Sequence, residues 1–292
     1  MKLERIELAD CGTPEALADA ILRQAPDMIL PVPVEEIAHQ LDITEIRRIE
    51  TKGFEGGLIA WDDKSDGVIL VNNSGSRQRQ RFTIGHELGH FLNPWHKPKN
   101  AEGFRCTSSD IHVTSAQPGD RATQMEVEAN RFSVELLIPK PLFQKDLRGK
   151  RGLDVSHIVG LARKFDMSKE STARRYTELQ DEACAVVISQ NGKILRCYRH
   201  KEFPCVSVKP GDPVPAFSIA VSGRLLPGEP SEWNEIDLAI WSSRRKPGLL
   251  LEQVLVQRQG FRLILLALPE GDEDEEVEQD TFAVWDVPRF GR

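Results

Sequence analysis

Hydrophobic positions in the first 180 residues recur mainly at the three-to-four-residue spacing of amphipathic helices. Thr13-Pro14-Glu15 combines an N-cap residue, a first-turn proline and an early acid, so a helix is predicted to run from here to about Arg23. The same reasoning predicts further helices at residues 34–41, 81–93 and 121–138, and a helix–turn–helix pair at 155–179.

Strands are predicted in two parts of the chain. Residues 57–61 and 68–71 are short hydrophobic runs on either side of a polar turn, and residues 45–49 are a further candidate strand. From residue 183 onward the pattern is mainly that of strands, with hairpins predicted at 185–198, 250–268 and a last strand at 282–285. The chain is therefore predicted to be an α+β protein, with one domain at residues 1–180 and a smaller one at 181–292.

Composition narrows the class of protein. The 292 residues are 40% hydrophobic and 28% charged, which is typical of a globular protein that can bury a real core. No apolar run approaches the length needed to span a bilayer, and Met1-Lys2-Leu3-Glu4-Arg5 lacks the core of a signal peptide. Five cysteines without paired spacing do not predict a disulfide framework. We expect a cytoplasmic protein without membrane contact, and the net charge of −7 argues against a chain-wide nucleic-acid footprint.

The strongest chemical signal is His-Glu-x-x-His at residues 86–90. Histidines four residues apart on a helix point the same way, so His86 and His90 can share one zinc ion. Glu87 lies beside that face, where it can reach a water at the metal and act as a general base. The alternative is an amphipathic helix whose two histidines are ordinary residues.

The rest of this helix fits a buried position. Ile84, Leu88 and Phe91 fall opposite the histidines and are predicted to face the core. Gly89 leaves room for another backbone to approach, and Asn93 followed by a proline ends the helix.

A third metal ligand is predicted in the second long helix. Its hydrophobic stripe comprises Met125, Ala129, Phe132 and Leu136, and its polar stripe comprises Gln124, Glu128, Arg131 and Glu135. Glu128 is therefore expected to face water. Glu126 lies off that face and is predicted to bind the metal, with Asn130 orienting a ligand. The alternative is that both acids are solvated.

The two helices resemble the ImmA/IrrE metallopeptidase family. The resemblance covers roughly residues 15–180 and is carried by Arg-Phe-Thr-Ile-Gly-His-Glu-Leu-Gly-His-Phe-Leu and by Glu-x-x-Ala-Asn-x-Phe-x-x-Glu-Leu-Leu-Ile-Pro. It implies a zincin-like N-terminal domain with His86, His90 and Glu126 as zinc ligands and Glu87 as catalytic acid/base. It also implies a cytoplasmic protease that cuts a helix-turn-helix repressor and so derepresses stress, phage-defence or mobile-element genes.

The second part of the chain is expected to control the first. Its strand pattern and the family analogy suggest a GAF- or PAS-like sensor that receives a nucleic-acid or small-molecule signal. The basic helical pair at 150–180 permits DNA contact, although packing against the peptidase core is the favoured interpretation. The strand just before the first histidine helix could offer an exposed edge to an extended peptide, or be a solvated edge without that role.

Three questions stay open at this level. Cys106, in the loop between the ligand helices, could fill the fourth metal position and keep the enzyme inactive, or be a small buried hydrophobe. The group that stabilises the oxyanion could be His112, Arg105 or Tyr176. A non-hydrolytic zincin scaffold that binds a partner protein or DNA is the alternative function, but it has no need of an intact Glu87.

Overall fold

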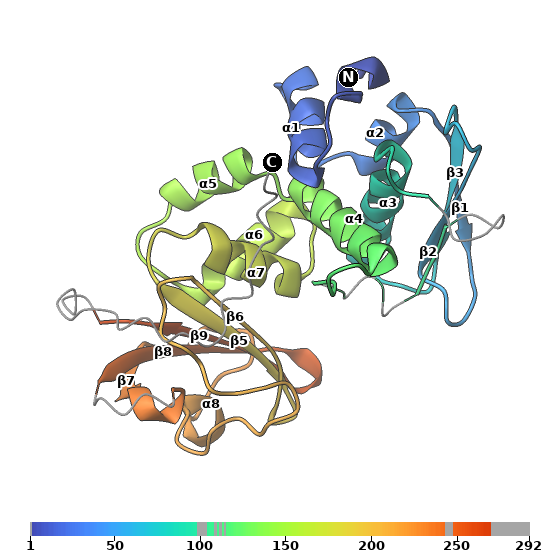
Figure 1. The fold of residues 1–292 in the computed structure, drawn as a ribbon. Coiled ribbons are helices and arrows are strands. Elements are labelled where there is room, and N and C mark those ends of the chain that lie inside the picture. Colours follow the sequence, from blue (N-terminus) through green and yellow to red (C-terminus); the bar gives the residue numbers. More distant parts are fainter. Residues whose placement is uncertain are drawn as a thin grey trace.

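The protein contains two β-sheets joined by helices (Figure 1). The structure, a computed structural model, describes residues 2–97, 104–107, 110, 113, 115–242 and 248–269, with the backbone alone at 104–106. The elements of the first part are η1 (Arg5–Leu8), α1 (Pro14–Gln24), α2 (Val34–Gln40), β1 (Ile43–Ile49), β2 (Gly56–Ala60), β3 (Gly67–Asn72), α3 (Arg77–Leu92), β4 (Phe104–Cys106), α4 (Arg121–Leu137), α5 (Lys140–Arg148), α6 (Val155–Phe165) and α7 (Lys169–Leu179).

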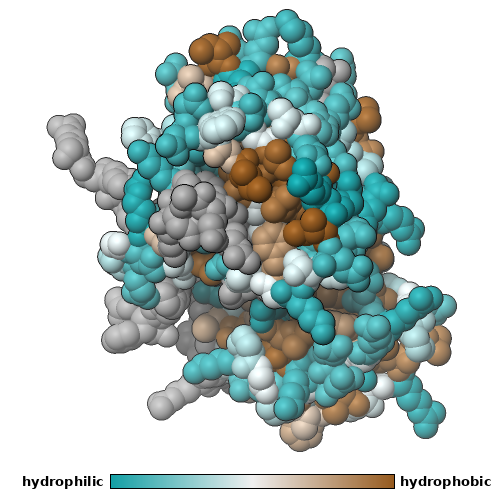
Figure 2. Space-filling model, turned by 90° about the vertical axis from the view of Figure 1, so that its right-hand side faces the viewer, coloured by the Kyte–Doolittle hydropathy of each residue, from teal (hydrophilic) through white to brown (hydrophobic). Residues whose placement is uncertain are grey.

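The first sheet has the strand order β1-β3-β2-β4. β1 runs parallel to β3, whereas β2 is antiparallel to both β3 and β4. The sequence-based expectation that the strand before the histidine helix has an exposed edge is wrong, because β1 and β2 occupy both edges of β3. Figure 2 shows hydrophobic side chains among hydrophilic ones on one face of the molecule. Ile59 of β2 and Trp61, which follows that strand, are both exposed.

Helix α3 packs between this sheet and α4. Ile84, Leu88 and Phe91 are buried in the main core, as the periodicity predicted. Gly89 faces α4 so closely that a Cβ there would lie 2.9 Å from Phe132 Cδ1 and 3.3 Å from Ala129 Cα. The close approach expected from this glycine is therefore present, and it brings the histidine-bearing face of α3 next to α4.

The second sheet is fully antiparallel and has the order β6-β5-β9-β8-β7. Both predicted hairpins are present, β5–β6 and β8–β9, whereas the expected strand at 282–285 lies outside the described residues. Sequence reasoning missed the short β7 and α8. The elements here are β5 (Cys184–Gln190), β6 (Lys193–Arg199), α8 (Ile219–Ser222), β7 (Asn234–Asp237), η3 (Leu238–Ile240), β8 (Leu249–Val256), η4 (Arg258–Gly260) and β9 (Phe261–Ala267).

Helices α6 and α7 connect the two parts. α6 contacts β8 and β9, and α7 contacts β5 and β6, so the pair covers one face of the second sheet. Val186, Leu255 and Leu265 on that face belong to the same core cluster as Leu88 of α3. Only Arg174 and Glu178 of α7 are exposed. The helical pair therefore has the packing role that the sequence favoured. Too few side chains of α7 are accessible for this helix to bind in a DNA groove.

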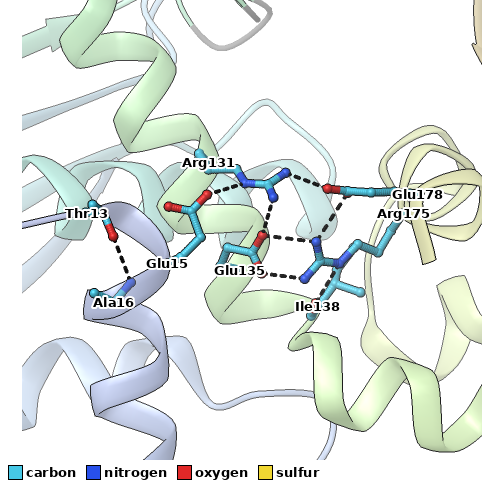
Figure 3. Close-up of polar contacts among 8 residues, drawn as sticks. All are labelled: Thr13, Glu15, Ala16, Arg131, Glu135, Ile138, Arg175 and Glu178. Atoms are coloured by element: carbon cyan, nitrogen blue, oxygen red, sulfur yellow. Dashed lines mark hydrogen bonds and ion pairs between the residues drawn. The ribbon is translucent and has the colours of Figure 1, made fainter. Parts of the chain in front are cut away.

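A network of ion pairs ties α7 to α4 and α1 (Figure 3). The buried Arg175 guanidinium donates through Nη1 to Glu135 Oε1 at 3.0 Å and through Nε to the carbonyl oxygen of Ile138 at 3.2 Å. Arg131 pairs with Glu135 at 2.9 Å and also reaches Glu15 and Glu178. The polar stripe predicted for α4 is thus partly an internal surface, because α7 covers Glu135.

Candidate metal centre

His86 and His90 lie one turn apart on α3 and are completely buried. The helix begins after Ser76, whose hydroxyl accepts the backbone N–H of Arg79, and it ends before Asn93 as predicted. The two Nε2 atoms are 3.1 Å apart, so both rings point to the same spot. The helix therefore holds two imidazoles ready to share one ligand.

Glu126 of α4 completes a group of three. Its Oε2 atom lies 3.2 Å from His86 Nε2 and 3.4 Å from His90 Nε2. In a tetrahedral zinc site with bonds of about 2.0–2.2 Å, neighbouring ligand atoms are separated by about 3.3–3.6 Å. The three observed separations are close to that value, so two imidazoles and one carboxylate fit a divalent metal such as zinc.

The charge states of these residues are coupled. Burial acts to lower the pKa of His86, but the hydrogen bond with Glu126 and the charges of Glu87 and Glu126 outweigh it and raise that pKa. Burial in the protein lowers the pKa of His90 to about 3, which keeps its imidazole neutral and its lone pair available. Burial acts to raise the pKa of Glu126, but hydrogen bonds and charge from the two histidines outweigh it and hold that pKa well below its usual value. Glu126 therefore supplies a carboxylate rather than a carboxylic acid.

Asn130 holds His86 in the required tautomer. Asn130 Nδ2 donates to the backbone carbonyls of Asp110 at 2.9 Å and Val113 at 3.0 Å, which fixes the orientation of the amide. Asn130 Oδ1 then faces His86 Nδ1 at 2.9 Å and accepts a hydrogen bond from its N–H group. With the hydrogen on Nδ1, the Nε2 atom of His86 keeps its lone pair for the metal position. The structure thus brings Asn130 to the place that the sequence predicted.

His90 has a corresponding neighbour that sequence reasoning missed. His90 Nδ1 lies 3.0 Å from Nδ1 of the buried His96, and His96 Nε2 lies 2.9 Å from Glu128 Oε2. The expectation that Glu128 faces water is only partly correct: its side chain is 30% exposed, but the turn after α3 folds back and places His96 against its carboxylate. The signal available in the sequence was the clustering of three of the seven histidines between residues 86 and 96.

Glu87 is completely buried beside β2. A Cβ atom on Gly56 would lie 2.8 Å from Glu87 Oε1 and would also clash with Thr83 Cγ2. The glycine in β2 therefore makes the space for the Glu87 carboxylate. Lys64 Nζ donates hydrogen bonds to the carbonyl oxygens of His90 and Asn93, both at 2.7 Å. These bonds supply partners to carbonyl groups at the C-terminal end of α3 that the helix itself leaves unpaired.

Comparison with known proteins agrees with this geometry. Residues 43–177 match the family model described as Peptidase_M78, IrrE N-terminal-like domain. This part of the chain is therefore similar to the metal-binding domain of ImmA/IrrE-type metallopeptidases. Over 117 residues it is 31% identical to the radiation response metalloprotease IrrE of Deinococcus radiodurans, covering 40% of this chain and 32% of that relative. Over 110 residues it is 34% identical to the protein of that name from Deinococcus deserti, covering 37% and 35%. The matches thus span about a third of the length of these curated relatives.

The likeness in fold extends beyond the ImmA/IrrE-type domain. A solved structure described as a Mycobacterium tuberculosis transcriptional regulator superposes with a TM-score of 0.54, covering 87% of this chain and 75% of that chain at 13% identity. At this identity the comparison concerns the fold alone. Within the described ranges, no helix combines the length and apolar character needed to cross a membrane.

Several residues predicted for the ImmA/IrrE-type site are not brought together by the described structure. The backbone of Cys106 pairs with Gly56 at the edge of the first sheet, but its side chain lies outside the described part, as do the side chain of Arg105 and the whole of His112. The predictions for these three residues therefore stay predictions. The hydroxyl of Tyr176 is buried 3.4 Å from His157 Nδ1 of α6, in the interface between α6 and α7.

Proposed function

We propose that this protein is a zinc endopeptidase that cleaves a helix-turn-helix repressor and so derepresses stress, phage-defence or mobile-element genes. The observation that carries the proposal is the convergence of His86, His90 and Glu126 on one point, with Glu87 buried on the same helix. The match of residues 43–177 to a metallopeptidase family model supports the reaction class, and the similar proteins are named as radiation response metalloproteases.

In the proposed mechanism, His86, His90 and Glu126 hold the zinc ion and Asn130 keeps His86 oriented. When bound, zinc polarises the peptide carbonyl and lowers the pKa of water. Glu87 accepts a proton from the attacking water as the new carbon–oxygen bond forms, and then delivers that proton to the amine nitrogen as the carbon–nitrogen bond breaks. The buried position of Glu87 keeps its carboxylate out of bulk water, where proton transfer would compete with solvent.

We further propose a division of roles, with residues 1–180 as a zincin-like peptidase and residues 181–292 as a GAF- or PAS-like sensor of a nucleic-acid or small-molecule signal. A groove of about 870 Å³ is lined by residues of both parts, which supports a functional connection between the peptidase and the sensor. Its lining includes Asn130 of α4, Arg174 of α7, and Arg196 and Tyr198 of β6. A ligand in this groove would contact the second sheet and the partner of His86 together.

The proposed activity is tested with the purified protein and helix-turn-helix proteins encoded by neighbouring genes. We expect at least one of them to be cut when zinc is present, and cutting to stop with a chelator and resume when zinc is added back. Glu126→Ala serves as a matched control that carries the same fold without a complete ligand set. Cutting that continues at the same rate in the presence of chelator and in Glu126→Ala would contradict the proposal.

Gly56→Ala is expected to lower the cleavage rate by up to roughly a hundredfold, because the new Cβ displaces the Glu87 carboxylate. The double variant Gly56→Ala/Thr83→Ser removes the methyl group that also clashes, so it should recover thermal stability without recovering activity. Thermal unfolding and initial cleavage rates separate the two effects. Full activity in Gly56→Ala would show that the position of Glu87 is not critical.

A further inference from the structure

We propose that Glu128 and His96 form a positioning chain that fixes the tautomer and ring orientation of His90, an inference that rests on the proposed metal site. The chain runs from the carboxylate of Glu128 on α4, through the imidazole of His96 in the turn after α3, to His90 on α3. Neither His96 nor Glu128 lies within the group of three that can hold the metal. Both act through His90.

The position of each proton in the chain follows from its neighbour. The ionised carboxylate of Glu128 can only accept, so the proton between it and His96 sits on His96 Nε2. A neutral His96 then has a lone pair on Nδ1 and accepts a hydrogen bond from the N–H group at His90 Nδ1, 3.0 Å away. His90 is left with its lone pair on Nε2, which is the atom that faces His86 and Glu126. The carboxylate of Glu128 thus determines, through His96, which tautomer of His90 faces the metal position.

The chain is held rigidly at each link. His90 and His96 are buried, and their ring centroids are 4.9 Å apart. The Glu128 side chain is 30% exposed, yet Asn93 Nδ2 donates to its Oε2 at 3.3 Å and Gln124 Nε2 donates to its Oε1 at 2.9 Å. These donors favour the ionised form and hold the carboxylate against His96.

The two metal-binding histidines are therefore oriented in different ways. His86 donates to a neutral amide, whereas His90 donates to an imidazole that is itself bound to a carboxylate. Partners of this kind fix ring orientation and raise the basicity of the ligand, and their loss typically costs about 10- to 100-fold in metal affinity. Zinc binding through His90 therefore depends on Glu128, which contacts His96 and not His90 itself.

The test measures zinc affinity of the full chain by competition with a chromogenic chelator, in the absence of substrate. We expect His96→Ala and Glu128→Ala each to weaken zinc binding by about 10- to 100-fold. Glu128→Gln keeps an oxygen that can accept from His96 and should recover most of the loss. Glu45→Ala, which removes an exposed carboxylate of β1 that pairs with Arg47, is the matched control and should stay within about threefold of the unmodified protein.

The double variant His96→Ala/Glu128→Ala distinguishes a chain from two separate effects. If Glu128 acts through His96, the double variant binds zinc as weakly as His96→Ala alone. Losses that multiply would contradict the chain. Unchanged affinity in Glu128→Ala, whose side chain lies at the surface end, would overturn the proposal even if His96→Ala failed to fold.

Nitrogen-15 spectra of the histidine rings provide a second measurement that a purely structural role would not affect. In the unmodified protein His96 should carry its hydrogen on Nε2 and His90 on Nδ1, and Glu128→Ala should release His96 into a mixture of tautomers. The opposite tautomer on His96 would refute the assignment. Because neither measurement uses a substrate, failure to find a cleaved repressor would count against the proposed function without affecting this result.

Discussion

Glu87→Gln is expected to bind zinc as tightly as the unmodified protein and to cleave its substrate about two to four orders of magnitude more slowly. The amide has almost the same shape as the carboxylate, so the space beside Gly56 stays filled. It cannot accept a proton from the attacking water, however, and the chemical step loses its general base. Single-turnover cleavage rates and chelator competition measure the two properties separately.

The matched control is Glu35→Gln, which removes the same charge from an exposed position on α2 where the carboxylate pairs with Arg48. This variant should keep full activity. If Glu87→Gln retained the unmodified cleavage rate with zinc bound, Glu87 would not be the base and another group would have to take the proton.

Arg175→Met is expected to destabilise the protein by about 3–5 kcal/mol, because it leaves the buried Glu135 carboxylate without its closest cationic partner. The loss should fall toward the lower end of this range, since Arg131 still contacts Glu135 at 2.9 Å (Figure 3). Denaturant unfolding measured on the full chain gives the change in the free energy of unfolding.

The double variant Arg175→Met/Glu135→Leu tests the cause of that loss. Removing both charges leaves no unpaired carboxylate, so the double variant should be more stable than Arg175→Met alone. Arg131 would retain Glu15 and Glu178 as partners. Equal instability in the single and double variants would mean that lost packing of the long arginine side chain, rather than the unpaired charge, explains the effect.

The parts of the site that were predictable from sequence are those that depend on local periodicity. The spacing of His86 and His90 places both on one helix face, and the position of Glu126 off the hydrophobic stripe of α4 directs it toward them. These relations follow from about 100° of rotation per residue and need no knowledge of the rest of the fold. The same reasoning correctly placed Ile84, Leu88 and Phe91 in the core.

The errors concern contacts made by distant segments. Periodicity assigned Glu128 and Glu135 to the outer face of α4, but it carries no information about His96 folding back or about α7 packing from the opposite side. The central position of β3 was missed for the same reason, because its parallel pairing with β1 spans β2 and the loops on either side of β2. Short elements such as β7 are too brief to give a clear pattern.

The packing of α6 and α7 bears on how a stimulus at the second sheet could travel. Side chains of the second sheet and of the histidine-bearing helix α3 belong to one continuous hydrophobic core. A displacement of the sheet would therefore act on closely packed side chains that continue to α3. An unrelated sheet in this position would therefore need a new packing surface on α6 and α7.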